Sequence, residues 1–459
     1  MKLKNKLGYS AASVTDAANF TFMNSYILFF LTTVCNVNPG TAGTITVIGT
    51  IISSVWSPIV GFLSDRCRSR FGRRRPFLMM ALLPLLLSLF MCFINIGFTG
   101  ALRNVYYCIG VTLFWCSFST FYSPWLTLAA ELTDDYNERT SMRSITFSIA
   151  QAGTLLGMAV PPILVEKMTH AGLSTVRAWT ATALFIGLIA GLCLMITIVS
   201  TSGKDMQLNK EETEDMSPEA GGVRLLFKEY WEVIQLKPMI FIILMSLGHM
   251  TAQGIFFSDR AYMFEYNLGL TTGETSLAIV LFSLSCLILT SPITMISKKL
   301  DKRSTLAFLL CLSAALVSIY EVTKGISNFT EVVILSFAFA IGNSAFWQLM
   351  PVMLYDVCEY DEWENGRRRE GVIVSVQPLL ETICSGLSAF VLGLILEHAG
   401  FDGSAEIQTE SALRGVELSF SIVPAILMLF TAAMTMLYPI SRKTYERIKK
   451  DLNRGGAQL

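Results

Sequence analysis

The chain has 459 residues, of which 53% are hydrophobic and 15% are charged, and its formal net charge at pH 7 is zero. A soluble protein of this length carries about 25% charged residues, so the composition indicates a polytopic membrane protein. The ten cysteines form no CxxC pair, and no HExxH, GxSxG or Walker-type motif occurs, which argues against zinc sites, the common membrane hydrolases and ATP-driven pumps. We therefore expect a membrane protein that is not an enzyme and that uses no cofactor or metal.

Long apolar runs account for most of the chain. A helix needs about 20 apolar residues to cross the hydrocarbon core of a bilayer. Runs of this kind occur twelve times, so the sequence predicts an all-α membrane protein with twelve transmembrane helices. The predicted spans are 10–36, 41–64, 77–98, 104–132, 143–166, 177–201, 238–266, 273–297, 304–323, 329–356, 371–397 and 414–440.

The turn from Gly61 to Phe77, GFLSDRCRSRFGRRRPF, holds six arginines between two apolar runs. Arginine this dense belongs in water, and lysine and arginine are in excess in the cytoplasmic loops of membrane proteins. The other basic turns also join even-numbered to odd-numbered spans, at Arg139 and Arg143, Lys298 to Arg303, and Arg367 to Arg369. Both termini are therefore predicted to be cytoplasmic.

A polar segment at 202–222 follows the sixth span, and its charged, Gly and Ser residues are typical of a linker. The next stretch, VRLLFKEYWEVIQL (223–236), mixes apolar and charged residues at helical spacing, so we expect it to lie on the membrane surface. Two six-helix bundles would then surround a shared cavity and rock to give alternating access. The predicted parts are an N-terminal six-helix bundle (1–201), a cytoplasmic linker with an amphipathic helix (202–237), a C-terminal six-helix bundle (238–441) and a cytoplasmic tail (442–459).

Polar side chains lie inside several spans, where they are costly and often line a substrate pathway. Amides, hydroxyls and aromatic rings together suit a sugar, because its hydroxyls need donors and acceptors while its C–H face stacks on an indole. The same groups can instead hold helices together or pack as ordinary aromatic residues, and both interpretations stay open. The predicted substrate-binding residues are Asp16, Asn19, Tyr122, Trp125, Gln151, Asn343, Trp347 and Gln377. Other polar residues of the spans are Gln253, Asp259, Arg260, Gln348 and Glu381.

Three long motifs resemble the glycoside-pentoside-hexuronide:cation symporters, the melibiose permease-like branch of the major facilitator superfamily. They are SPIVGFLSDRCRSRFGRRRPF (57–77), AELTDDYNERTSMRS (130–144) and GNSAFWQLMPVMLYDVCEYDEWENGRRREGVIVSVQ (342–377). The resemblance implies the major facilitator fold and a sugar or glycoside in a central cavity. It places Trp347 on the helix-ten tryptophan that lines this cavity, Trp125 next to the helix-four aromatic residue, and Asp16 close to the helix-one aspartate.

The resemblance also reveals departures at the cation site of the family. Its cation-coupled members carry two helix-two aspartates where this chain has Ser53 and Ser57. Sodium prefers several oxygen ligands, and carboxylates offset the cost of its dehydration, so a sodium site of the family type is not expected. Asp16 and Glu381 are then the candidates for proton coupling, because a buried carboxylate favours its protonated form. A helix-holding role for Glu381, uniport and ion-independent exchange stay open.

Charged residues at the predicted cytoplasmic ends of the spans are candidate gates. Acidic residues and arginines in both halves can pair when the inner side is shut and separate when it opens. Arginines that only fix the topology are the alternative. The predicted gating residues are Asp65, Arg66, Arg70, Asp356, Glu359 and Arg368.

Together these features predict a secondary transporter in the inner (plasma) membrane of a bacterium. We expect a monomer that moves a small-molecule sugar or glycoside by alternating access, with a proton and the lipid bilayer as its other partners and no nucleic acid. A transporter of a lipid-like or other amphipathic solute on the same fold is the alternative, followed by a membrane-embedded sensor. The identity of the substrate, the coupling ion and the direction of transport do not follow from the sequence.

Overall fold

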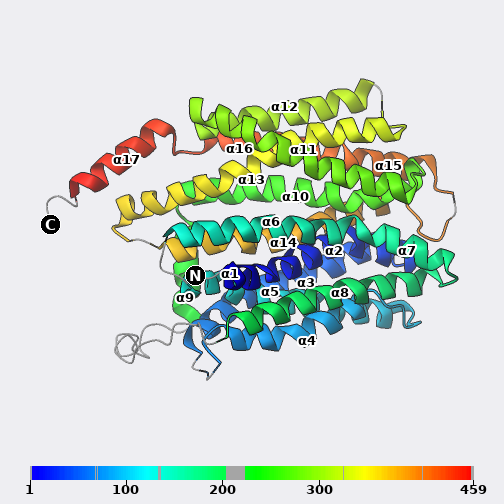
Figure 1. Cartoon of the computed structure of the whole chain (residues 1–459). Coiled ribbons are helices and arrows are strands. Elements are labelled where there is room, and N and C mark those ends of the chain that lie inside the picture. Colours follow the sequence, from blue (N-terminus) through cyan, green and yellow to red (C-terminus); the bar gives the residue numbers. More distant parts are fainter. Residues whose placement is uncertain are drawn as a thin grey trace. The chain divides into compact units, whose positions relative to one another are not determined.

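The computed structural model describes residues 3–67, 69, 71–132, 136–202, 223–323, 325–367, 369–405 and 407–455, and in these ranges all regular structure is helical (Figure 1). The elements in chain order are α1 (Leu3–Ser10), α2 (Ala12–Phe29), η1 (Phe30–Val34), α3 (Pro39–Arg66), α4 (Arg75–Cys92), α5 (Gly100–Leu132), α6 (Tyr136–Met158), α7 (Val160–His170), α8 (Thr175–Ser200), α9 (Val223–Ile234), α10 (Lys237–Tyr262), η2 (Met263–Asn267), α11 (Thr272–Lys299), α12 (Lys302–Thr323), α13 (Phe329–Asn365), α14 (Glu370–Ala399), α15 (Glu410–Phe420), α16 (Ile422–Leu437) and α17 (Arg442–Gly455).

Twelve helical stretches in the described residues are long and apolar enough to cross a bilayer, which confirms the predicted number. Most of their boundaries agree with the predicted spans to within a few residues. The tenth span differs most, because it was predicted to end at 356 whereas α13 continues to Asn365. With 37 residues, α13 is much longer than the roughly 20 that a crossing needs, so its end extends beyond the hydrocarbon.

Helices are expected in these spans because the hydrocarbon offers no water to unpaired backbone groups. The departures from regular helix recur in both halves of the sequence. The first long helix of each half ends in a π-helical turn, η1 or η2. Prolines interrupt the second and fourth spans at Pro58 and Pro124, and the eighth and tenth at Pro292 and Pro351. This recurrence is what an internal repeat of six spans predicts.

The chain divides into two compact units. Unit 1 comprises Met1–Val223, Thr271–Ile279 and Ala389–Gln408, and unit 2 comprises Arg224–Leu270, Val280–Ser388 and Thr409–Leu459. Two stretches from the second half of the sequence therefore group with unit 1. Each unit is described by itself below, and the predicted bundles 1–201 and 238–441 remain a prediction.

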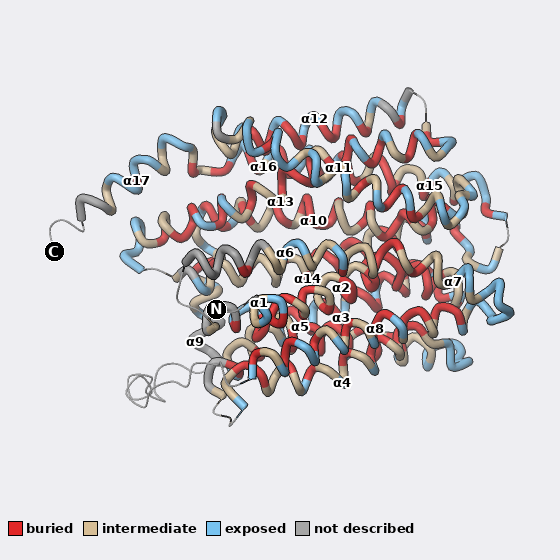
Figure 2. The backbone as a smooth tube through the Cα atoms, in the orientation of Figure 1, coloured by how far each residue is buried: buried red, intermediate tan, exposed pale blue. Residues whose placement is uncertain are grey.

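Aromatic and small residues fill the interiors of the units. In unit 1, Phe22 stacks on Phe93 with ring centroids 4.4 Å apart, and Trp179 stacks on Phe93 at 6.2 Å. In unit 2, Phe256 stacks between Phe339 and Phe420 at 4.1 and 4.6 Å. Buried positions run along α2 and α10, whereas α17 is mostly exposed (Figure 2). These contacts hold the helices that carry the polar side chains.

An ion cluster joins the ends of α12 and α15 in unit 2. Arg414 Nη1 donates a hydrogen bond to Glu321 Oε1 at 2.7 Å and another to Glu417 Oε2. The side chain of Glu321 is 0% exposed. Burial raises the pKa of Glu321 above its ordinary value of 4.5, and the Glu417 carboxylate adds to the rise while Arg414 opposes it. The fold therefore favours the protonated form of this carboxyl group.

Replacing Glu321 by glutamine should change how stability depends on pH. Because the pKa is raised in the folded state, the contribution of Glu321 to the free energy of unfolding is fully present below pH 4.5 and is lost as the pH rises through the folded-state pKa. Glu321→Gln cannot ionise, so the variant should gain thermal stability relative to the parent as the pH rises. Thermal unfolding in detergent over a pH series measures this difference, with the exposed Glu410→Gln as the control. A difference that does not vary with pH would contradict the prediction.

Candidate functional site

The predicted aromatic residues of α5 occupy two different environments in unit 1. Trp125 is 3% exposed and stacks between Phe121 and Tyr9, at 5.7 and 5.6 Å. Its Nε1 donates to the Tyr9 carbonyl at 3.3 Å. A sugar hydroxyl would have to displace that carbonyl, because the indole N–H is already bonded within the packing of α1 and α5, and the cavity role of Trp125 remains a prediction. Tyr122 is partly exposed and stacks on Phe118 at 5.7 Å.

Asp16 on α2 and Gln151 on α6 are both partly exposed. Their helices lie against each other, since a Cβ added at Gly153 would come within 3.0 Å of Ala17 Cβ, and one at Gly157 within 2.3 Å of the Ala18 carbonyl oxygen. Only glycine permits this approach of α6 to α2. The two predicted residues therefore come from neighbouring helices of one unit.

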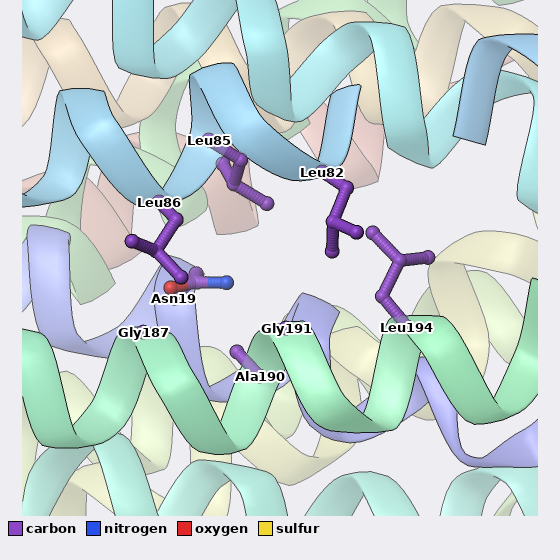
Figure 3. Close-up of a pocket in the computed structure, with 8 residues that line it drawn as sticks. All are labelled: Asn19, Leu82, Leu85, Leu86, Gly187, Ala190, Gly191 and Leu194. Atoms are coloured by element: carbon purple, nitrogen blue, oxygen red, sulfur yellow. The ribbon is translucent and has the colours of Figure 1, made fainter. Parts of the chain in front are cut away.

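Asn19 lies elsewhere. It is 1% exposed, and its Nδ2 donates to the Thr15 carbonyl at 2.8 Å. It faces a small cavity inside unit 1 (Figure 3), which is also lined by Leu82, Leu85, Leu86, Gly187, Ala190, Gly191 and Leu194. Apart from Asn19 itself, this lining of leucine, alanine and glycine residues has no hydroxyl or charged group for a sugar. Asn19 is therefore turned to the interior of unit 1 between α4 and α8, and its substrate-binding role remains a prediction.

The two serines of α3 also differ in environment. Ser53 is wholly buried, and its Oγ donates to the Trp115 carbonyl at 2.8 Å and lies 2.7 Å from Ser119 Oγ. Ser57, one turn later, is partly exposed. The hydroxyl of Ser53 thus joins α3 to α5 through uncharged groups. Neither serine supplies the negative charge that a bare sodium ion requires in a low-dielectric site.

In unit 2, an indole and an amide form a partly exposed pair. Trp347 on α13 donates its Nε1–H to Gln253 Oε1 on α10 at 3.0 Å. Asn343, one turn earlier, is buried, and its Oδ1 lies 3.2 Å from His249 Nε2 while its Nδ2 contacts Cys286 Sγ at 3.9 Å. The Trp347–Gln253 pair can meet a ligand, whereas Asn343 links three helices. Gln253 was recognised as a polar residue of its span but was not predicted to be a site residue.

A second partly exposed pair lies on α14, one turn apart. Gln377 Nε2 donates to Glu381 Oε1 at 3.0 Å. The neighbouring Thr382 is buried and its hydroxyl donates to the Pro378 carbonyl at 3.1 Å. Glu381 is therefore held by an amide of its own helix, with a neutral hydroxyl beside it.

The predicted gating residues are only partly described. Asp65 and Arg66 lie in α3, but their side chains, together with Arg70 and Arg368, are outside the described residues. In unit 2, Asp356 accepts two hydrogen bonds from Lys302 Nζ, at 2.6 and 2.9 Å. Glu359 accepts from the Tyr445 hydroxyl at 3.2 Å, and so α17 is tied to the end of α13.

Arg369 forms the strongest described pairing at this end of unit 2. Its Nη2 and Nε donate to the two oxygens of Asp361 at 2.7 and 2.9 Å, and its Nη1 donates to Glu232 of α9 at 2.8 Å. The side chain of Asp361 is 0% exposed. The amphipathic helix α9, expected on the membrane surface, is thus bonded to unit 2, and the Tyr230 hydroxyl adds a 2.6 Å contact to Ser375.

Unit 1 has close backbone contacts at the opposite ends of the spans. A Cβ added at Gly393 would lie 2.4 Å from the Pro39 carbonyl oxygen, and one at Gly43 would lie 2.7 Å from that of Ala389. Ser276 Oγ donates to the Ala159 carbonyl at 3.0 Å. Stretches 271–279 and 389–408 therefore dock on helices from the start of the chain. Glycine in an apolar helix was the only signal in the sequence for these contacts.

Comparisons with known proteins show which family and which fold the chain is similar to. Residues 8–442 match the family model described as MFS/sugar transport protein. The chain is 23% identical over 454 residues to an uncharacterized symporter, YnaJ of Bacillus subtilis (strain 168), covering 98% of this chain and 95% of that protein. It is 23% identical over 460 residues to an isoprimeverose transporter of Lactiplantibacillus pentosus, covering 99% and 92%. A solved D-xylose-proton symporter has a TM-score of 0.64 at 14% identity, covering 95% of this chain and 98% of that one, which shows the fold alone.

The glycine contacts of unit 1 lead to a testable expectation. Gly393→Leu cannot fit beside Pro39 unless α14 moves away from α3, so it should populate conformations in which this contact is open. The measurement is maleimide labelling of a Ser276→Cys reporter, quantified by mass spectrometry of its peptide. Labelling should rise by about tenfold, which corresponds to roughly 1.4 kcal/mol in the equilibrium. Gly371→Leu on the same helix is the control, because a Cβ there meets nothing within 4 Å. Equal labelling in both variants would rule out this role for Gly393.

Proposed function

The chain belongs to the MFS/sugar transport protein family, which confirms the resemblance seen in its three motifs, and we propose that it carries a sugar or glycoside across the bacterial inner membrane by alternating access. The observation that carries this proposal is the partly exposed Trp347–Gln253 pair, with the amide and carboxylate of Gln377 and Glu381 in the same unit. A flat indole beside hydrogen-bonding side chains matches the two faces of a sugar ring. The relationship to an isoprimeverose transporter supports the same substrate class.

The residues divide into substrate and structural roles. In unit 2, Trp347 would stack on the sugar ring, while Gln253, Gln377 and Glu381 would bond its hydroxyls. In unit 1, the partly exposed predicted residues Asp16, Tyr122 and Gln151 would supply further contacts. Trp125 and Asn343 are left out of the proposed contact set because their polar atoms bond to neighbouring helices, and Asn19 is left out because it is buried beside an apolar cavity.

Alternating access needs contacts that hold one side shut and can exchange. At the ends predicted to be cytoplasmic, the Arg369–Asp361–Glu232 and Lys302–Asp356 pairs would brace the second bundle. At the other ends, the contact of Gly393 with Pro39 would close the outer side. With both termini cytoplasmic, the two gates then lie on opposite sides of the membrane.

The ion that could drive transport depends on which carboxylates lie inside the spans. Ser53 and Ser57 replace the carboxylates of the family's cation site, and Ser53 is already engaged by Trp115 and Ser119. A sodium-independent mechanism therefore fits the residues best. Glu381 would carry a proton if transport is proton-coupled, and uniport is the alternative that requires no ion.

Counterflow in proteoliposomes tests this function. Vesicles are loaded with one unlabelled methyl glycoside at a time, of glucose, galactose, xylose or a disaccharide built from them. Entry of the same glycoside in labelled form is then followed without an ion gradient. At least one sugar should exchange.

Trp347→Phe keeps an aromatic ring but leaves Gln253 without its hydrogen-bond donor. The affinity for the exchanged sugar should therefore fall by about fivefold, in line with the loss of about 1 kcal/mol for one hydrogen bond. Trp363→Phe, at an exposed site of the same helix, is the control. Exchange of no sugar, or an unchanged affinity in Trp347→Phe, would contradict the proposal.

A further inference from the structure

The charges inside the spans restrict the substrate further. We infer, on the basis of the proposed sugar site, that Glu381 makes this site accept neutral or ammonium-bearing sugars and reject sugars that carry a carboxylate. The inference rests on where the membrane-embedded charges lie and on which of them a ligand can reach.

Glu381 is a carboxylate without a counter-charge among the described residues. Its one described hydrogen-bond partner is Gln377, which donates to Oε1 at 3.0 Å and is itself neutral. Glu381 is partly exposed, and the next residue, Thr382, donates its hydroxyl to the Pro378 carbonyl. The second carboxylate oxygen is therefore available to a hydroxyl or ammonium donor of a ligand.

Among the described residues of the same unit, the positive charge that lies well inside a span is that of Arg260, and a ligand cannot reach it. Arg260 on α10 is 4% exposed, and its guanidinium carbon lies 4.5, 4.7 and 4.8 Å from the ring centroids of Phe282, Phe256 and Phe257. Three aromatic faces enclose the cation and hold it in the interior. The neighbouring Asp259 is wholly buried and accepts a hydrogen bond from Ser419 at 2.9 Å.

The remaining described lysines and arginines of the twelve spans lie within a few residues of a span end, as Lys237, Lys302 and Arg414 do. Among the described residues, Asp16 of unit 1 is a second partly exposed carboxylate well inside a span. Among the described residues of unit 2, a carboxylate ligand at Glu381 would thus meet a like charge and no reachable lysine or arginine. Like charges in a desolvated site repel strongly, and such repulsion is an effective way to exclude a competing ligand.

Matched competitors that differ only at C6 test this inference. The probes are a methyl hexoside, its 6-amino-6-deoxy analogue and the corresponding methyl hexuronide, each in the glucose and galactose series, competing against counterflow of the labelled sugar at pH 7.5. The hexuronide should compete at least about tenfold less well than the neutral sugar, while the amine competes as well or better. Glu381→Gln should reduce the discrimination against the hexuronide to less than about threefold, and Glu381→Asp should retain it. Glu397→Gln, an exposed position at the end of the same helix, is the control.

The possible results distinguish a failure of the charge selectivity from a failure of the proposed sugar transport. If the parent protein accepts the hexuronide as readily as the neutral sugar, or if Glu381→Gln leaves the ratio unchanged while still exchanging the neutral sugar, the inference is wrong and the sugar function stands. If Glu381→Gln does not fold, the ratios in the parent and in Glu381→Asp still decide the charge selectivity. If no sugar exchanges at all, the proposed function itself fails.

Discussion

The absence of water in the hydrocarbon core is the constraint on which the rest of this structure depends. It requires every backbone group to be bonded within its own segment, and so the spans are helices throughout the described residues. It also makes each polar side chain inside a span expensive, so these side chains are either bonded to a neighbouring helix or face a wet pathway. Ser53, Asn343 and Trp125 are buried and bonded to neighbouring helices, whereas Trp347 and Glu381 remain partly exposed. The functional proposals depend on this division.

Close packing by glycine is the second feature that shapes the protein. Helices in a bilayer cannot gain hydrophobic free energy by leaving water, so their association depends on close contact and hydrogen bonds. Gly153 and Gly157 let α6 approach α2, and Gly43 and Gly393 allow the backbone contacts at the other end of α3 and α14. The contact of Gly393 lies on α14 at a distance along the chain from Glu381, whereas Gly153 and Gly157 lie on the same helix as the proposed sugar contact Gln151. The Gly393 contact could therefore determine which side of the transporter is shut without taking part in substrate recognition.

The number and limits of the spans could be predicted because hydropathy is a property of consecutive residues. The roles of single side chains could not, since they depend on how each helix is rotated within its unit. Trp125 and Trp347 look alike in the sequence, but the first packs against Tyr9 and the second reaches Gln253. Likewise, Arg369, which was not among the predicted gating residues, makes the described ion pairs, whereas the predicted Arg368 lies outside the described residues. Asn19 was predicted from its polarity, which does not reveal that it faces a cavity lined by leucine, alanine and glycine residues.

We propose that this chain transports a sugar although Ser53 and Ser57 replace the two carboxylates of the family's cation site. Accumulation of the exchanged sugar in proteoliposomes, measured with an inward sodium gradient and with a choline gradient of equal strength, tests it most directly. With Ser53 bonded to Trp115 and Ser119, the account predicts the same final level of sugar in both cases. Accumulation above equilibrium with sodium alone would contradict it, because that result requires a sodium site formed without the two missing carboxylates.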